Sequence, residues 1–331
     1  MRVTTLGTAL AIAAAACEPI HKAPPSSASE SPSSTAAALP PPAPPPTTSP
    51  QLPPAPTATK VAVVLGFLTP VAVLHDTAQD VYFVSSVNGS ATAKDDNGFI
   101  SRVRPDGTVE NLKFIEGGRS GTLNAPKGLA LQGDTLWVTD IDVVRAFNAR
   151  TGAAIESISL SGLGAVFLND IVITPTGALY VTDTGIRFDD IGNVLHPGPD
   201  RLFRIGTDRT VTVALRGDTL GRPSGIALDA PNKRFVIVQL GGKSVLAWRP
   251  GDKVPTVIGK GPGGFDGVVI AGGRILVSSM SDSTVSSYET GQEVRLVSGV
   301  PDPAAIGYDA KRNRVLIPII QGNRVEIWQL P

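Results

Sequence analysis

The segment LNDIVITPTGALYVTD, at residues 168–183, contains two short apolar runs separated by a turn. The second run, residues 179–182, is made of β-branched and aromatic residues of the kind enriched in strands. Between the runs, residues 175–177 read Pro-Thr-Gly, which is typical of a tight turn. The segment therefore predicts two antiparallel strands joined by a turn.

This unit occurs six times beyond Lys60. Each copy opens an apolar strand, at residues 70–73, 126–129, 168–171, 223–226, 265–268 and 303–306. Second strands follow at residues 81–84, 136–139, 179–182, 235–238, 275–278 and 315–317. Third strands alternate polar and apolar residues, as in 323–328, and fourth strands are shorter. A unit of about 40 to 45 residues cannot bury both sheet faces alone, so the six units should stack around an axis as an all-β, six-bladed β-propeller.

The two ends of the predicted propeller, residues 60–331, should meet. The last unit stops at Pro331 after three strands, and an apolar stretch, residues 61–65, precedes the first unit. We expect this N-terminal strand to complete the last blade and close the ring.

The amino terminus has the layout of a signal peptide over residues 1–16, with Arg2 before an uncharged apolar stretch. Small residues directly before Cys17 resemble the lipobox of bacterial lipoproteins, in which this cysteine is acylated; ordinary cleavage after Ala16 is the alternative. Residues 17–59 are rich in Pro, Ala, Ser and Thr and predict a disordered linker. We therefore expect an exported protein, in the periplasm or at the cell surface, held to a bacterial membrane only through Cys17.

Composition argues against several functions. The 29 basic and 29 acidic residues leave no net charge to attract nucleic acid. Of the three histidines, His21 lies in the linker and His75 on a strand, so neither a Ser-His-Asp triad nor a histidine-rich metal site is indicated. Cys17 is the only cysteine, so an intrachain disulfide is impossible.

A candidate site lies where the inner strands begin, because these positions should ring the mouth of the central channel. The six aligned residues are Val71, Lys127, Asn169, Ser224, Asp266 and Ala304. Four are polar, and converging polar groups in a concavity are the usual start of a binding-site hypothesis. The alternative is that Asn, Ser and Asp before a strand satisfy turn backbone groups.

Further candidates lie beside this ring. Asp170 directly follows Asn169 and is a candidate ligand-binding residue. Asp140 and Asp183 end two neighbouring second strands, and we expect them either to bind a ligand or to cap loops. Two long loops, residues 85–98 and 185–200, follow second strands and should overhang the same mouth.

Residues 168–170, 175–183, 265–267 and 273–276 resemble those of the SMP-30/gluconolactonase/LRE-like propellers, over about residues 60–331. This resemblance implies one divalent cation, calcium or zinc, at the channel mouth, and hydrolysis of lactones or phosphotriesters. It implies Asn169 and Asp266 as metal ligands, with Asp266 also as the catalytic base. Val71 stands where the family has Glu, and Ser224 where it has a second Asn, so the implied metal is at best weakly held.

Two functions follow, and whether the chain is an enzyme stays open. We favour a binding module whose mouth, with Lys127, Asn169, Ser224 and Asp266, holds a small anionic or polar ligand or a partner's loop. The alternative is a divalent-metal hydrolase of the lactonase type.

Overall fold

A computed structural model describes residues 57–331, apart from 190 and 290. The predicted signal peptide, Cys17 and residues 17–56 of the predicted linker lie outside these residues. In the described part of the chain, no helix has the length and hydrophobicity of a membrane span.

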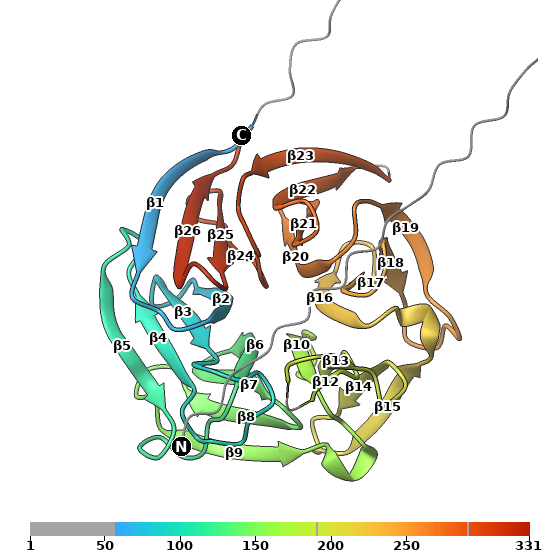
Figure 1. The fold of residues 1–331 in the computed structure, drawn as a ribbon, viewed down its shortest axis with the longest axis horizontal. Helices are drawn as coiled ribbons and strands as arrows, with labels where there is room; N and C mark the ends of the chain where they lie inside the picture. The colour runs from blue at the N-terminus through green and yellow to red at the C-terminus, as the bar shows by residue number, and fades with distance from the viewer. Residues whose placement is uncertain (1–56, 190, 290) are drawn as a thin grey trace, which may run out of the picture. The chain divides into compact units, whose positions relative to one another are not determined.

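The described residues form a six-bladed β-propeller, and each blade is a four-stranded antiparallel sheet (Figure 1). Six inner strands surround the axis: β2 (Pro70–Asp76), β6 (Pro126–Gln132), β10 (Leu168–Ile173), β16 (Pro223–Asp229), β20 (Phe265–Ala271) and β24 (Gly307–Asp309). We number blades 1 to 6 in this order. The second strands are β3 (Val81–Ser86), β7 (Thr135–Asp140), β11 (Leu179–Asp183), β17 (Arg234–Gln239), β21 (Arg274–Ser279) and β25 (Arg314–Ile319). The sixfold repeat is thus confirmed as six blades.

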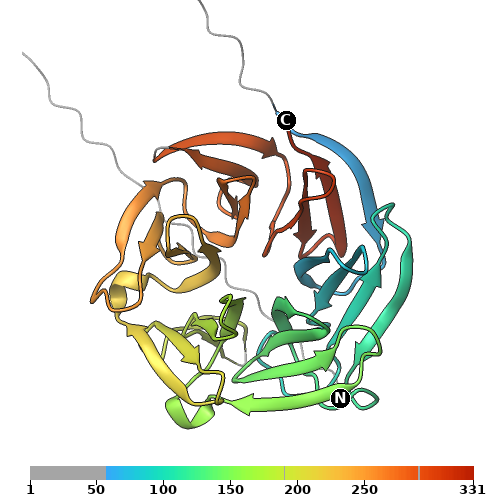
Figure 2. The same ribbon diagram turned by 180° about the vertical axis from the view of Figure 1, so that it is seen from behind.

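The outer half of each blade completes the sheet, as the view from behind also shows (Figure 2). The third strands are β4 (Phe99–Val103), β8 (Val143–Asn148), β14 (Arg201–Ile205), β18 (Ser244–Trp248), β22 (Thr284–Glu289) and β26 (Arg324–Gln329). The outermost strands are β5 (Val109–Glu116), β9 (Ala154–Ser159), β15 (Val211–Arg216), β19 (Thr256–Lys260), β23 (Gln292–Ser298) and β1 (Thr59–Leu65).

The N-terminal strand closes the ring. Strand β1 pairs antiparallel with β26, from Thr59 opposite Gln329 to Leu65 opposite Arg324. It supplies the outermost strand of blade 6 beside the chain's last strands (Figure 1). The predicted closure is confirmed, because β1 covers the edge of β26 that the three C-terminal strands leave open.

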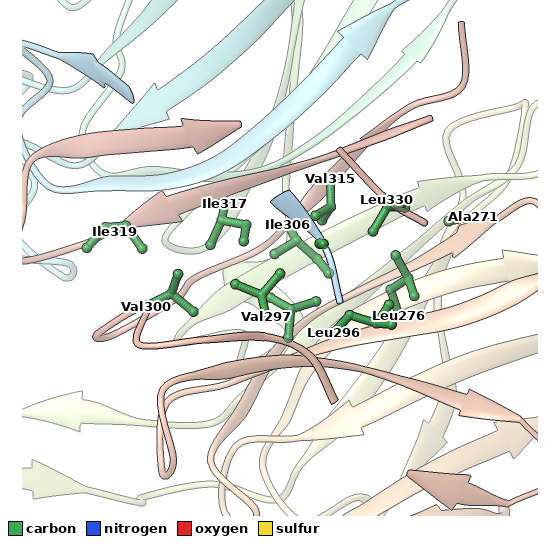
Figure 3. Close-up of a cluster of buried hydrophobic side chains, with 12 residues drawn as sticks. Ala271, Leu276, Leu296, Val297, Val300, Ile306, Val315, Ile317, Ile319 and Leu330 are labelled. Atoms are coloured by element: carbon green, nitrogen blue, oxygen red, sulfur yellow. The ribbon is translucent and has the colours of Figure 1, made fainter. Parts of the chain in front are cut away.

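The core is divided among the seams between neighbouring blades. At the seam of blades 5 and 6, Leu276, Val315 and Ile317 are fully buried and pack together, as Figure 3 shows. Fully burying one such side chain contributes about 1.5–3 kcal/mol. The seams therefore hold the ring together from one blade to the next.

Four seams also carry a repeated hydroxyl link near the channel. In blade 2, Thr139 Oγ1 accepts a hydrogen bond from the N–H of Gly128 (2.9 Å) and donates to the carbonyl of Asn169 in blade 3 (2.8 Å). The equivalent hydroxyls belong to Ser85, Thr182 and Ser278. Each link fixes the backbone of the next blade's mouth residue, so these hydroxyls position the candidate site.

The inner strands come very close to one another beside these links. A Cβ atom on Gly128 would lie 2.6 Å from the Cα of Asp170, and one on Gly267 would lie 2.4 Å from the backbone nitrogen of Ile306. Glycine is needed at such positions because it has no side chain to clash. In blade 3 the equivalent position is Asp170, which therefore sends a carboxyl group into the region between the inner strands.

Candidate functional site

Three of the six predicted mouth residues form one hydrogen-bonded chain across three blades. The Nδ2 atom of Asn169 donates to Ser224 Oγ at 2.8 Å, and Ser224 Oγ donates to Oδ1 of Asp266. The residues lie on β10, β16 and β20, in blades 3, 4 and 5. Propeller geometry thus brings together residues that lie 55 and 42 positions apart in the sequence.

This chain leaves two oxygen acceptors open at the mouth. Ser224 is fully buried, whereas Asn169 and Asp266 are each 6% exposed. No described residue forms a hydrogen bond with Asn169 Oδ1 or Asp266 Oδ2. Neither atom is fully buried without a partner, so both are accessible to solvent. A ligand would therefore meet an amide oxygen and a carboxylate oxygen from two side chains that Ser224 links.

Thr184 orients the amide of Asn169. The Nδ2 atom also donates to Thr184 Oγ1 at 3.1 Å, and that hydroxyl donates to the carbonyl of Pro223 at 2.8 Å. Both amide hydrogens of Asn169 are thus used, so its oxygen faces away from these partners. Thr184 was not predicted from the sequence, where its only signal is its place directly after Asp183 at the end of a second strand.

Two carboxyl groups near the mouth have raised pKa values, so they are protonated at higher pH than an ordinary aspartate. Burial raises the pKa of Asp266 to about 6, although the hydrogen bond from Ser224 opposes the rise. Burial also raises the pKa of Asp170 to about 7; the backbone N–H groups of Ile226 and Ile171 oppose the rise, and the Asp266 charge adds to it. Titratable groups perturbed in this way often mark functional sites.

Asp170 is held by backbone groups on both sides of the seam between blades 3 and 4. Its Oδ1 accepts from Ile171 N–H at 2.8 Å, and its Oδ2 accepts from Ile226 N–H at 2.9 Å. Its carboxyl group is therefore fixed in the lining of the central channel.

Lys127 lies in the mouth ring, but its ammonium group is turned into the protein. Nζ donates to the carbonyls of Ala91 and Ala125, each at 3.0 Å, and lies 4.4 Å from the ring centroid of Phe167. Burial lowers the pKa of Lys127 to about 8, while the charge of Asp140 opposes this. The bond to Ala91 ties the 85–98 loop to the mouth.

Asp140 and Asp183 cap loops at the ends of their strands. Asp140 accepts from the backbone N–H groups of Asn124 (3.1 Å) and Ala125 (2.8 Å) and pairs with Arg145 at 2.6 Å. Asp183 accepts from the N–H of Phe167 at 2.9 Å. Both aspartates are fully buried, and their role as ligand-binding residues stays a prediction.

The 185–200 loop contains an unexpected hairpin beside the mouth. It consists of β12 (Arg187–Phe188) and β13 (Val194–Leu195), and Phe188 packs edge-on against Phe167 at 6.4 Å between ring centroids. His196 Nε2 lies 2.7 Å from Asp200 Oδ1. The hairpin contains only two-residue strands, too short to show a clear alternation in the sequence.

The central channel contains a cavity of ≈ 330 Å³ lined by the inner strands. Its lining is mostly aliphatic and includes Asp170, His75 and Tyr308 as its ionisable side chains. The aliphatic members include Ala72, Leu129, Ile171, Ile226, Val268 and Ile306.

The residues present fit a divalent cation poorly. Among residues 57–331, leaving out 190 and 290, no group of three or more His, Cys, Asp or Glu side chains is placed to hold a metal. Asp266 offers one open carboxylate oxygen, Asp170 already accepts two N–H bonds, and Val71 offers none. Calcium needs six to eight oxygen ligands, so the protein would leave most of its coordination to water.

Comparison with known proteins supports the fold alone. No protein-family model and no curated protein matches the chain. A gluconolactonase from Xanthomonas campestris is similar in structure, with a TM-score of 0.60 and 17% identity over 85% of this chain and 99% of its own. A chain of the nidogen/laminin complex is also similar, with a TM-score of 0.53 and 20% identity over 69% of this chain and 79% of its own.

Proposed function

We propose that this propeller is a binding module that holds a small molecule rich in hydrogen-bond donors at its channel mouth. The observation that carries the proposal is the chain from Asn169 through Ser224 to Asp266, in which the side-chain oxygen of Asn169 and Oδ2 of Asp266 have no hydrogen-bond partner among the described residues. Hydroxyl or ammonium groups are the donors that complement such oxygens. The inward-turned Lys127 offers no support for the anionic ligand that the sequence suggested.

Binding of polyhydroxylated probes tests this proposal. D-glucono-1,5-lactone and myo-inositol would be titrated into the purified domain, and binding would be followed by ligand-observed NMR. Asp266→Asn replaces the open carboxylate oxygen by an amide and should weaken binding of either probe. Asp229→Asn is the matched control. Asp229 lies on the same inner strand as Ser224 but at its other end, where it accepts a hydrogen bond from Asn232. Equal binding by both variants would refute the assigned site.

The second candidate is lactone hydrolysis that depends on a divalent cation. It draws support from the likeness to a gluconolactonase and from Asn169 and Asp266, which lie within one hydrogen-bonded chain. Calorimetry with calcium and zinc, together with proton release from D-glucono-1,5-lactone, tests it. Tight metal binding that Asp266→Ala abolishes would favour the enzyme, whereas no heat at millimolar metal would end this candidate.

We also propose that the chain is exported and anchored at Cys17. The support is the uncharged apolar stretch before Cys17 and the Pro-rich residues after it, which would space the propeller from a membrane. Mass spectrometry of the mature N-terminus in a bacterial host tests this. Acylation at Cys17, lost in Cys17→Ala, is expected, whereas an unmodified Ala-Cys junction would contradict it.

A further inference from the structure

The channel and its mouth differ in chemistry. The inner strands present aliphatic side chains to the ≈ 330 Å³ cavity, including Val172, Ala227, Leu228, Val269 and Ile270. The mouth presents oxygen atoms from Asn169 and Asp266, and Asp170 lies at the boundary between the two regions. A molecule that fills both regions must combine a polar end with an apolar chain.

Neither carboxyl group at this boundary has a counter-ion. Among the residues that the structure describes, Ser224 is the side-chain partner of Asp266, and the carboxyl of Asp170 accepts from the N–H groups of Ile171 and Ile226. Across the described residues, no Lys, Arg or His side chain forms an ion pair with either carboxyl. Burial of unpaired carboxylates is costly, and the raised pKa values of both groups reflect that cost.

The basic side chains of the mouth ring and of the channel lining contact other groups. The ammonium of Lys127 is bonded to Ala91 and Ala125. His75 lies on the inner strand of blade 1, where its Nε2 is 3.1 Å from Asp80 Oδ1. Because no described basic side chain pairs with these groups, a cationic group on a ligand would stabilise the ionised form of both carboxyls.

We propose that the channel binds a primary alkylammonium ion, with its ammonium group beside Asp266 and Asp170 and its hydrocarbon chain along the aliphatic lining. This inference rests on the proposed function and narrows its ligand class. An ammonium group has three N–H donors, and the open oxygens of Asn169 and Asp266 accept two of them. An ion pair with a buried carboxylate is stronger than one in water.

A series of ligands tests the proposal on the intact domain. Butyl-, pentyl- and hexylammonium chlorides would be compared by calorimetry with the alcohols of the same chain length, in slightly alkaline solution where both carboxyls are ionised. Each amine should bind at least about tenfold more tightly than its alcohol, equivalent to about 1.4 kcal/mol. Each added methylene should tighten binding by about fourfold, because one buried CH₂ contributes about 0.8 kcal/mol.

Two variants separate the contribution of the ligand's ammonium group from that of its hydrocarbon chain. Asp266→Asn should reduce the difference in affinity between hexylammonium and hexanol, because Asp170 alone then faces the ammonium group, while Asp229→Asn should leave that difference unchanged. Val269→Phe should fill the channel and remove the dependence on chain length; Val269 is half-buried in the lining. The wild-type series alone decides the proposal if Val269→Phe fails to fold.

The outcomes distinguish this inference from the proposed function. Equal affinity for amines and alcohols, or no gain with chain length, would overturn the alkylammonium ligand. The proposed function would survive that result if the polyhydroxylated probes still bind and lose affinity in Asp266→Asn. Loss of both kinds of binding would overturn both.

Discussion

The hydroxyl of Tyr82 in blade 1 donates a buried hydrogen bond of 2.6 Å to Oδ2 of Asp309 in blade 6, 227 residues away. Burial and this hydrogen bond to Asp309 both raise the pKa of Tyr82, so the phenol stays protonated as a donor. Arg312 joins Asp309 to Asp80 of blade 1, with Nη1 at 3.0 Å from Asp309 and Nη2 at 2.6 Å from Asp80. Polar groups therefore join blades 1 and 6 near their inner strands. At the outer edge of blade 6, β1 pairs with β26 and leads into blade 1.

Removal of this hydroxyl should weaken ring closure. Tyr82→Phe leaves the carboxylate of Asp309 short of one buried partner, so the free energy of unfolding should fall by about 1–3 kcal/mol. Tyr308→Phe is the control, because the Tyr308 hydroxyl bonds to Asn313 within its own blade, at 3.0 Å and part-buried. Urea denaturation measures the free energy of unfolding of both variants. Equal decreases would show that the Tyr82–Asp309 hydrogen bond stabilises the protein no more than the Tyr308–Asn313 bond does.

The closing strand offers a second test. Val64 on β1 is buried against Val325 and Ile327, whereas Val63 is 46% exposed. Val64→Ala should therefore cost up to about 1.5–3 kcal/mol, and Val63→Ala should change stability by less than about 0.5 kcal/mol. Deletion of residues 61–65 should lower the melting temperature sharply, and an unchanged melting curve would contradict closure by this strand.

The hydroxyl links between blades predict a third effect. Thr182 Oγ1 accepts from Asp170 N–H and donates to the carbonyl of Ser224, so Thr182→Val leaves two buried backbone groups without that partner. The expected loss is about 1–3 kcal/mol. Thr176→Val, at an exposed turn, should be nearly neutral. Thermal unfolding compares the two, and similar melting temperatures would argue against the link.

The raised pKa of Asp266 predicts how stability depends on pH. The unfolded carboxyl titrates near pH 3.9, and the folded one near 6, so the native state binds more protons between these values. The free energy of unfolding should therefore fall as pH rises from about 4 to about 6 because of this group. Asp266→Asn removes the titrating group, so its stability should fall less across that range. Parallel pH profiles for variant and wild type, measured by urea denaturation, would refute the raised pKa.

Much of the candidate site was predictable because it starts from the repeat. Aligning the six strand openings placed Asn169, Ser224 and Asp266 at equivalent positions, and a propeller brings equivalent positions around one axis. The links through Thr182 and its equivalents also left a signal, a Ser or Thr as the last residue but one of four second strands. The sequence did not show that these hydroxyls link neighbouring blades, because a hydroxyl near the end of a strand can form hydrogen bonds with many different groups.

The amino-acid sequence by itself determined the number of blades, their strand order and the strand that closes the ring. These features follow from short-range patterns: apolar runs, turns and a last repeat that lacks one strand. Only the tertiary structure decided the direction of the Lys127 ammonium, the link between Asn169 and Asp266 through a buried hydroxyl, and the position of Asp170 in the channel lining. Side-chain direction depends on neighbours from other blades, and those contacts exist only once the blades have packed.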